Sequence, residues 1–286
     1  MGFFDNPDAS KLVQSHISII KTLEDKEAEK LVLKYREIRR ELRDRLDTLP
    51  ENTFSAQQLR GVLIQVEGAL DAMRTGLIKD MGESSSEAAI LGSDHLIRET
   101  EKFNSIFTGA ASNINVNAAS VALDTSNFLF NRYESSLTEY SSGIRALMSR
   151  NLSQAVIEQA PTSTVVKRMN KFLLGEEWKL TRLARTELHN VYNTAKQKTL
   201  FKVAEIEPKI MKTLIHPMDL RTGDDSKQAA KKNLIVPVDK PFKYTFTRKL
   251  KSGEIHREER VFMVPPDRPN DRSIMVPYME DWDSDA

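Results

Sequence analysis

The sequence has no cysteine, few aromatic residues and no long apolar run, and each of these features excludes a class of protein. Without cysteine, a disulfide scaffold and a cysteine-ligated zinc or iron–sulfur site are impossible. The longest apolar runs are a few residues, far below the roughly 20 that span a bilayer. Residues 1–5 lack the basic start and apolar core of a signal peptide. We therefore expect a protein of the cytoplasm, or of a particle assembled there, with no membrane partner.

Charge is balanced over the whole chain but not along it. There are 42 Lys and Arg and 41 Asp and Glu, and this formal net charge of +1 excludes a uniformly basic nucleic-acid coat. Residues 161–205 and 206–278 each carry a local net charge of +5, whereas residues 1–160 carry −5 and residues 279–286 carry −4. The basic half predicts weak binding of double-stranded DNA through its phosphates. The alternative is that these side chains pair with acids of this chain or of a protein partner.

Helical periodicity dominates the first 200 residues. Apolar side chains recur every three or four positions over residues 25–49, and Pro50 ends this helix. Ser55 and Gln58 then form a capping box for a second helix, which Gly82 closes. Residues 108–120 are small and polar, which favours a loop over a hinge or a tight helix crossing. The pattern predicts two long antiparallel helices before this loop.

Three further helices are expected after the loop. The first covers residues 126–158 and is broken by Pro161. A short helix follows, capped by Thr162, Ser163 or Thr164, and stops at Gly175. The last covers residues 176–203.

Beyond residue 206 the pattern changes to short apolar bursts among prolines, eight of the eleven in the chain. These bursts have the length of strands. A two-residue turn at Ser252–Gly253 would pair Tyr244 with Val261, although a longer loop would shift this register. A final strand begins at Ile274 and should end before Pro277.

The predicted fold class is therefore α+β, with a long helical N-terminal region followed by a small C-terminal α+β region with a β-hairpin. We expect three regions along the chain: a helical region over residues 1–160, a second region over residues 161–278 and an acidic tail over residues 279–286.

Few residues suggest catalytic or metal chemistry. The five histidines lack metal-ligand spacing, and we expect them on the surface or partly buried. Asp224 and Asp225 could bind a divalent ion, but adjacent loop acids are usually only solvated. No phosphate-binding glycine loop, nucleophile elbow or zinc-protease motif is present. The sequence predicts no catalytic residue, no cofactor and no metal.

One helical segment carries a row of hydrogen-bond donors. Helical spacing places these residues on one side of the helix, where they could bind phosphates or the carbonyl groups of another domain. The alternative is a solvated helix face. The candidate binding residues are Arg182, Arg185, Thr186, His189, Asn193, Lys196 and Lys198.

Two polar clusters follow this helix. The first contains Asp219, Arg221 and Thr222, and the second contains Asn270 and Arg272 just before the final strand. Each cluster alone is typical of an ordinary polar loop.

The order of these motifs resembles the phage head morphogenesis family, the minor head proteins related to the F protein of bacteriophage Mu. The resemblance rests on Arg-x-x-Arg-Thr-Glu on a helix, then Asp-x-Arg-Thr, then Pro-Asn-x-Arg before a last strand, over about residues 178–278. It implies a minor capsid protein inside the phage head, associated with the portal protein and with the major capsid or scaffold protein. Head morphogenesis, entry into the cell with the genome, and DNA binding are further implied.

The chain departs from the family pattern at two places. Ser226 and Lys231 stand where the family has His and Gly, and Asp271-Arg272-Ser273 stands for its Cys-Arg-Cys. A metal or redox role for those His and Cys residues is therefore not available here.

The remaining motif residues favour a structural role, which is to tie the long helix to the α+β region through Arg185, Glu187, Asp219, Arg221, Thr222, Asn270 and Arg272. In particular we expect Arg185, Asp219 and Arg272 in one polar network.

Three functions are compatible with these observations. A structural virion protein comes first, and a non-specific DNA-binding accessory protein of packaging or ejection is the alternative. An enzyme, such as a nuclease or a toxin-like transferase, comes third because no acid pair with defined spacing supports it.

Overall fold

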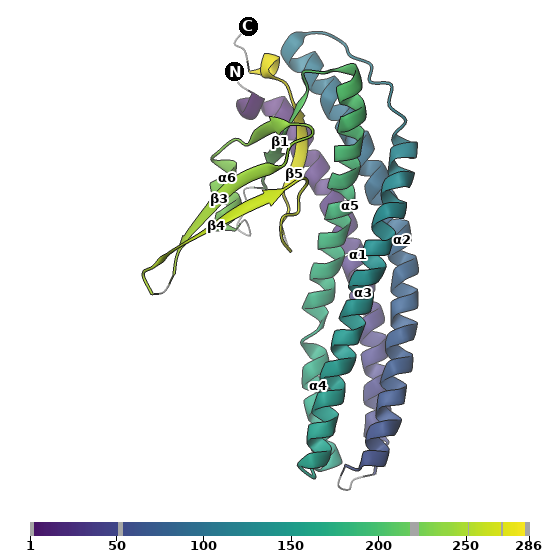
Figure 1. Cartoon of the computed structure of the whole chain (residues 1–286). Helices are drawn as coiled ribbons and strands as arrows, with labels where there is room; N and C mark the ends of the chain where they lie inside the picture. The colour runs from purple at the N-terminus through teal and green to yellow at the C-terminus, as the bar shows by residue number, and fades with distance from the viewer. Residues whose placement is uncertain (1–2, 51–53, 218–222, 251, 270, 284–286) are drawn as a thin grey trace. The chain divides into compact units, whose positions relative to one another are not determined.

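The computed structural model describes residues 3–50, 54–217, 223–250, 252–269 and 271–283. Its long helices are α1 (Pro7–Asp47), α2 (Ala56–Thr108), α3 (Ala118–Ile157) and α5 (Glu177–Ile206), with the shorter α4 (Thr162–Leu174) before α5 (Figure 1). The C-terminal elements are β1 (Met211–Ile215), α6 (Asp224–Ala230), β2 (Ile235–Pro237), β3 (Phe242–Lys249), β4 (Ile255–Phe262) and β5 (Ile274–Tyr278). Two short 3-10 helices, η1 (Phe3–Asp5) and η2 (Glu280–Trp282), lie near the ends of the chain. The expected α+β class is confirmed.

Helix α1 begins at Pro7 and so extends well before the stretch over residues 25–49 in which the apolar periodicity was described. The side-chain Oδ1 of Asn6 accepts hydrogen bonds from the backbone N–H groups of Asp8 and Ala9, both at 3.0 Å. Asparagine at the N-cap followed by proline at the first helical position is a strong start signal. The apolar stripe of α1 therefore extends back through Val13 and Ile20, which are buried.

Helix α2 starts where its capping box predicts and ends far beyond the predicted end. The Ser55 N–H donates to Gln58 Oε1 at 2.8 Å, and the Gln58 N–H donates to Ser55 Oγ at 3.2 Å. Gly82 lies inside the helix and does not close it. A helical glycine costs about 1 kcal/mol, which burial of Leu77 and Leu96 on either side outweighs.

The loop over residues 109–117 confirms the expected loop between α2 and α3. Helix α4 follows Pro161 and ends before Gly175, as predicted. However, its N-cap is Pro161 itself, and no side-chain hydrogen bond caps it, so the expected Thr or Ser cap is wrong.

The chain forms two compact units. Unit 1 comprises residues 1–24, 84–129 and 185–286, and unit 2 comprises residues 25–83 and 130–184. Four long helices contribute to both units. The regions expected from the sequence were continuous, whereas each unit gathers distant segments.

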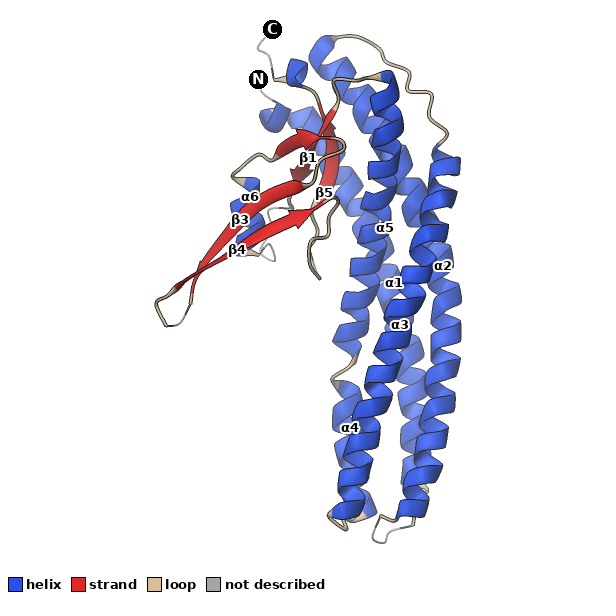
Figure 2. Ribbon diagram, in the orientation of Figure 1, coloured by secondary structure: helices blue, strands red, loops and turns tan. Residues whose placement is uncertain are grey.

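Unit 2 is built of helices alone in the described residues (Figure 2). Its core is mostly apolar, with Leu31, Leu42, Val66, Met73 and Leu137 each at most 4% exposed. Hydrophobic burial is the main source of stability in such a helical layer.

Unit 1 combines helices with two antiparallel sheets. Its three-stranded sheet has the order β2-β1-β5, so β1 is the central strand. Strand β5 continues to Tyr278 and pairs Pro277 with Lys212, which corrects the expected end before Pro277. Proline lacks the N–H of a ladder, and β5 tolerates it because it is an edge strand.

The hairpin β3–β4 has a register one residue away from the predicted one. Tyr244 lies opposite Arg260 instead of Val261, because the turn holds the three residues between Leu250 and Glu254 instead of two. Gly253 has a positive φ of 87°, as a three-residue hairpin turn requires. The buried face of β3 is as predicted, but Val261 on β4 is 52% exposed.

The ends of the described chain meet in an aromatic cluster of unit 1. Trp282 is 1% exposed, and its ring lies 5.8 Å from that of Phe3 and 5.5 Å from that of Phe103. The Trp282 Nε1–H donates to Asn104 Oδ1 at 3.0 Å. Within the expected acidic tail, Met279 and Trp282 are buried, whereas the acidic residues Glu280, Asp281 and Asp283 are exposed. None of the helices described here is long and apolar enough to span a membrane.

Candidate functional site

Most residues of the donor row on α5 belong to unit 1, and three of them are buried there. Asn193 and Lys196 are 0% exposed and His189 is 3% exposed, whereas Thr186 and Lys198 are half-buried. The three buried residues do not form the solvated face that was the alternative, and they contact protein groups, with His189 on the backbone carbonyl of Ser273. Arg182 belongs to unit 2, where its guanidinium lies 4.6 Å from the centre of the Trp178 ring.

His189 joins α5 to α1 and to the C-terminal segment. Its Nδ1 lies 2.7 Å from Glu24 Oε1 and its Nε2 lies 2.7 Å from the backbone oxygen of Ser273. Burial lowers the pKa of His189, but the Glu24 carboxylate and the Ser273 carbonyl outweigh burial and hold the pKa above its ordinary value. Both ring nitrogens face acceptors, so the ring donates from both as an imidazolium.

Asn193 connects the same helix to β5. Its Nδ2 donates to the His189 backbone oxygen at 3.1 Å, and its Oδ1 accepts the Met275 backbone N–H at 2.9 Å. Strand β5 thus receives a side-chain partner from α5 at a fully buried position. This contact fixes the sheet against the helix, because a buried N–H left without a partner is costly.

A second buried group centres on Glu99 of α2. The Lys196 Nζ donates to both Glu99 oxygens at 2.7 Å, and His16 Nδ1 lies 2.8 Å from Glu99 Oε1. Burial lowers the pKa of Lys196, and the Glu99 carboxylate opposes this effect. One lysine, one histidine and one carboxylate therefore hold three helical segments of unit 1 together.

His95 stacks on His16 with ring centres 3.7 Å apart, and its Nδ1 lies 2.9 Å from the Tyr192 hydroxyl. Burial, together with electrostatic interactions with His16 and Lys196, lowers the pKa of His95 to about 2. His95 is therefore neutral in the folded protein. Together with His16, His189 and His216, it is buried, so the expected surface or partly buried placement is wrong for four histidines.

A third cluster lies in the loop before β5. The Ser273 hydroxyl donates to Asp271 Oδ1 at 2.5 Å, so it accepts from His216 Nδ1 at 2.6 Å. This order differs from a catalytic triad, in which histidine lies between serine and acid. Ser273 is also 1% exposed, which leaves its oxygen closed to a substrate in this conformation.

The two predicted loop clusters are only partly within the described residues. Asp219, Arg221, Thr222 and Asn270 lie outside them, so the network of Arg185, Asp219 and Arg272 stays a prediction. Glu187 is buried, and Arg185 and Arg272 are half-buried.

Asp225 is paired with a cation of the chain itself. Its Oδ1 accepts from Arg268 Nη2 at 2.6 Å, and Arg268 also donates to Asp267 at 2.8 Å. Across the part of the chain that the structure describes, no group of three or more His, Cys, Asp or Glu is arranged to hold a metal ion.

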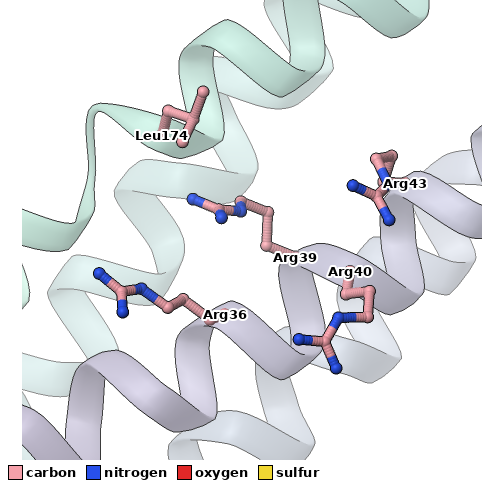
Figure 3. Close-up of a pocket in the computed structure, with 5 residues that line it drawn as sticks. All are labelled: Arg36, Arg39, Arg40, Arg43 and Leu174. Carbon is pink, nitrogen blue, oxygen red and sulfur yellow. The ribbon is translucent and has the colours of Figure 1, made fainter.

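Unit 2 presents a different kind of site, a hollow of about 430 Å³ lined by Arg36, Arg39, Arg40, Arg43 and Leu174. We call it the arginine hollow. Figure 3 shows Arg36 and Arg39 extending from α1 toward the helix that carries Leu174. The arginines occupy positions i, i+3, i+4 and i+7 of α1, which share one helix face.

Two of these arginines also hold the junction between α4 and α5. Arg36 donates to Glu177 Oε2 from Nη2 at 2.7 Å, and Arg39 donates to Glu177 Oε1 at 2.6 Å. The hydrogen bond and charge of Arg36 hold the pKa of Glu177 below its ordinary value. Next to them, the Tyr35 hydroxyl donates to the Leu173 backbone oxygen at 2.8 Å. The first turn of α5 is thus fixed to α1.

Sequence reasoning missed the arginine hollow although the spacing was visible. The segment alternates arginine with Glu37 and Glu41, which suggests a face of intrahelical ion pairs. At about 100° per residue, Glu37 and Glu41 fall outside the arc that the four arginines occupy. A helical projection of residues 36–43 alone would have separated the two signs.

No protein-family model, no curated protein and no solved structure matches this chain.

Proposed function

We propose that this chain is a structural minor capsid protein of a tailed bacteriophage, associated with the portal and acting in head morphogenesis. The observation that carries the proposal is the internal use of the motif residues. His189 and Asn193 follow Arg-x-x-Arg-Thr-Glu on α5, and they bind the backbone of Ser273 and Met275 at the final strand. A structural protein needs polar motifs that hold its own elements together.

The same geometry favours a non-enzymatic role. The serine, histidine and acid that do meet, Ser273, His216 and Asp271, are buried and have serine in the middle position. The lysine and carboxylate at Lys196 and Glu99 are 0% exposed and neutralise each other. These groups stabilise the fold, and a substrate would have to open the core to reach them.

The proposal is tested on particles of a phage that encodes the chain. Quantitative mass spectrometry of purified heads should detect the protein in a small number of copies relative to the major capsid protein. Chemical cross-linking of the same heads should connect it to the portal protein. Its absence from particles that are complete and infectious would overturn the proposal.

A non-specific DNA-binding accessory protein is the second candidate, and the arginine hollow favours it. Four arginines on one helix face form a positive surface of the kind that binds phosphates. The full-length chain should then slow the migration of duplex DNA in a gel at about 50 mM salt, and this binding should disappear at a few hundred millimolar salt. No retardation at low salt would exclude this candidate.

A further inference from the structure

The arginine hollow carries more positive charge than the structure of unit 2 uses. Glu177 accepts from Arg36 and Arg39, and its side chain is 19% exposed. Arg43 contacts only its sequence neighbour Asp44 among the described residues, at 3.2 Å, and this pair is 49% and 61% exposed. A pair so exposed contributes little, about 0–1 kcal/mol.

Arg40 is exposed and lines the same hollow. Like Arg43, it is not among the arginines that hold Glu177. The hollow therefore has two kinds of arginine. Arg36 and Arg39 are fixed in place by the α4–α5 junction, whereas Arg40 and Arg43 are available for an anion from outside.

We propose that the arginine hollow is a binding site for adjacent phosphate groups. A guanidinium presents a planar fork of donors that matches two oxygens of one phosphate, and several forks on one face can hold more than one phosphate. From Arg36 to Arg43 the helix rises by about 10 Å at 1.5 Å per residue. Such a row suits neighbouring phosphates better than a single small anion.

Two sources offer this chemistry, a free polyphosphate and the backbone of a nucleic acid. The volume of the hollow, about 430 Å³, limits the size of a free polyphosphate that it could hold. The row of arginines along α1 is open, so that a nucleic-acid backbone could also lie along it. The inference concerns the site itself and does not depend on the virion role. The two proposals fail separately. If the chain enters phage heads without binding phosphate, only the phosphate site is overturned, and if it binds phosphate without entering heads, only the virion role is overturned.

The test measures binding of inorganic triphosphate and of a short DNA duplex to the full-length chain by titration calorimetry at low salt. The test variant is Arg40→Gln with Arg43→Gln, which keeps the contacts of Arg36 and Arg39 with Glu177. The control is Arg145→Gln with Arg150→Gln on α3 of unit 2, which removes the same charge away from the hollow. Thermal unfolding confirms that both variants are folded.

We expect affinity to fall at least about tenfold in the test variant and much less in the control, since hydrogen bonds to charged groups are the strong ones. If triphosphate shows this loss, the site binds a free polyphosphate. If only DNA shows it, with a shallower salt dependence in the test variant, the ligand is the nucleic-acid backbone. No binding of either ligand, or equal losses in both variants, would overturn the proposal.

Discussion

The two units of this protein bury different kinds of side chain. In unit 1 the interior contains imidazoles, carboxylates and lysines, including Glu99 and Lys196 at 0% exposure. In unit 2 most buried residues among those described are apolar, although the carboxylates of Glu27 and Glu176 are also buried, and its arginines line a surface hollow. Long helices contribute to both units, so each helix changes from one kind of interior to the other along its length.

The difference follows from what each unit has to hold together. Helices alone can satisfy their backbone groups internally and need only an apolar stripe. Strand β5 and the loop before it bring backbone groups that need partners, and α5 supplies them through His189 and Asn193. His189 and Asn193 are therefore buried where sheet and loop meet helix, whereas Glu99, Lys196 and His16 join helices to one another.

The largest expected effect tests the buried charges. Lys196→Met leaves Glu99 buried with only His16 beside it, and should destabilise unit 1 by about 3–5 kcal/mol. The matched change in unit 2 is Lys34→Met, which breaks the half-exposed pair of Lys34 with Asp80 and should cost about 1 kcal/mol or less. Urea unfolding followed by hydrogen exchange measures both.

Equal losses of unfolding free energy in the two lysine variants would show that the units do not differ in how much their buried charges matter. Lys196→Met combined with Glu99→Leu should recover part of the loss, because no unpaired charge then remains in the core.

The next effect tests how closely the helices approach. A Cβ at Gly92 of α2 would overlap the backbone oxygen of Tyr192 on α5, so Gly92→Ala should destabilise unit 1 by about 1–3 kcal/mol. Gly68 in unit 2 has open space around it, and Gly68→Ala should stabilise by about 0.5–1 kcal/mol. Thermal unfolding of the two variants should shift in opposite directions, and a shift in the same direction would contradict this comparison.

The smallest effect concerns acid. The pKa of His95 is lowered to about 2 in the folded chain and is about 6.5 when unfolded, so the unfolded state binds the extra proton. The stability from neutral His95 is present above pH 6.5 and is lost as the pH falls, by up to about 1.4 kcal/mol per pH unit. His95→Gln should remove this part of the pH dependence.

The reporter for the acid effect is Trp282, which is buried in unit 1, in a background with Trp178→Phe because Trp178 is exposed in unit 2. Identical pH slopes with and without His95, between pH 6.5 and 5.5, would show that the pKa of its imidazole is not lowered in the folded protein.

Much of the helical fold could be predicted from local signals. The Ser55–Gln58 box, the break at Pro161 and the end near Gly175 each depend on a few neighbouring residues. The prediction that Gly82 closes α2 failed because the packing on both sides of this glycine, and not its local preference, decides whether the helix continues. The hairpin register depended on a single extra turn residue, which no periodic pattern reveals.

The site was predicted less well than the fold. The row on α5 was recognised, but sequence spacing cannot distinguish a face toward solvent from a face toward β5. The partners of His189 and Lys196 lie 165 and 97 residues away, so nothing local indicated their burial. The arginines of α1, in contrast, could have been found from their helical spacing alone.

The most direct test of this account is hydrogen exchange of the full-length chain with and without triphosphate or duplex DNA at low salt. Ligand should slow exchange in α1 around residues 36–43, while residues 186–198 of α5 stay equally protected in both samples. Ligand-dependent protection of residues 186–198, with no change around residues 36–43, would contradict it.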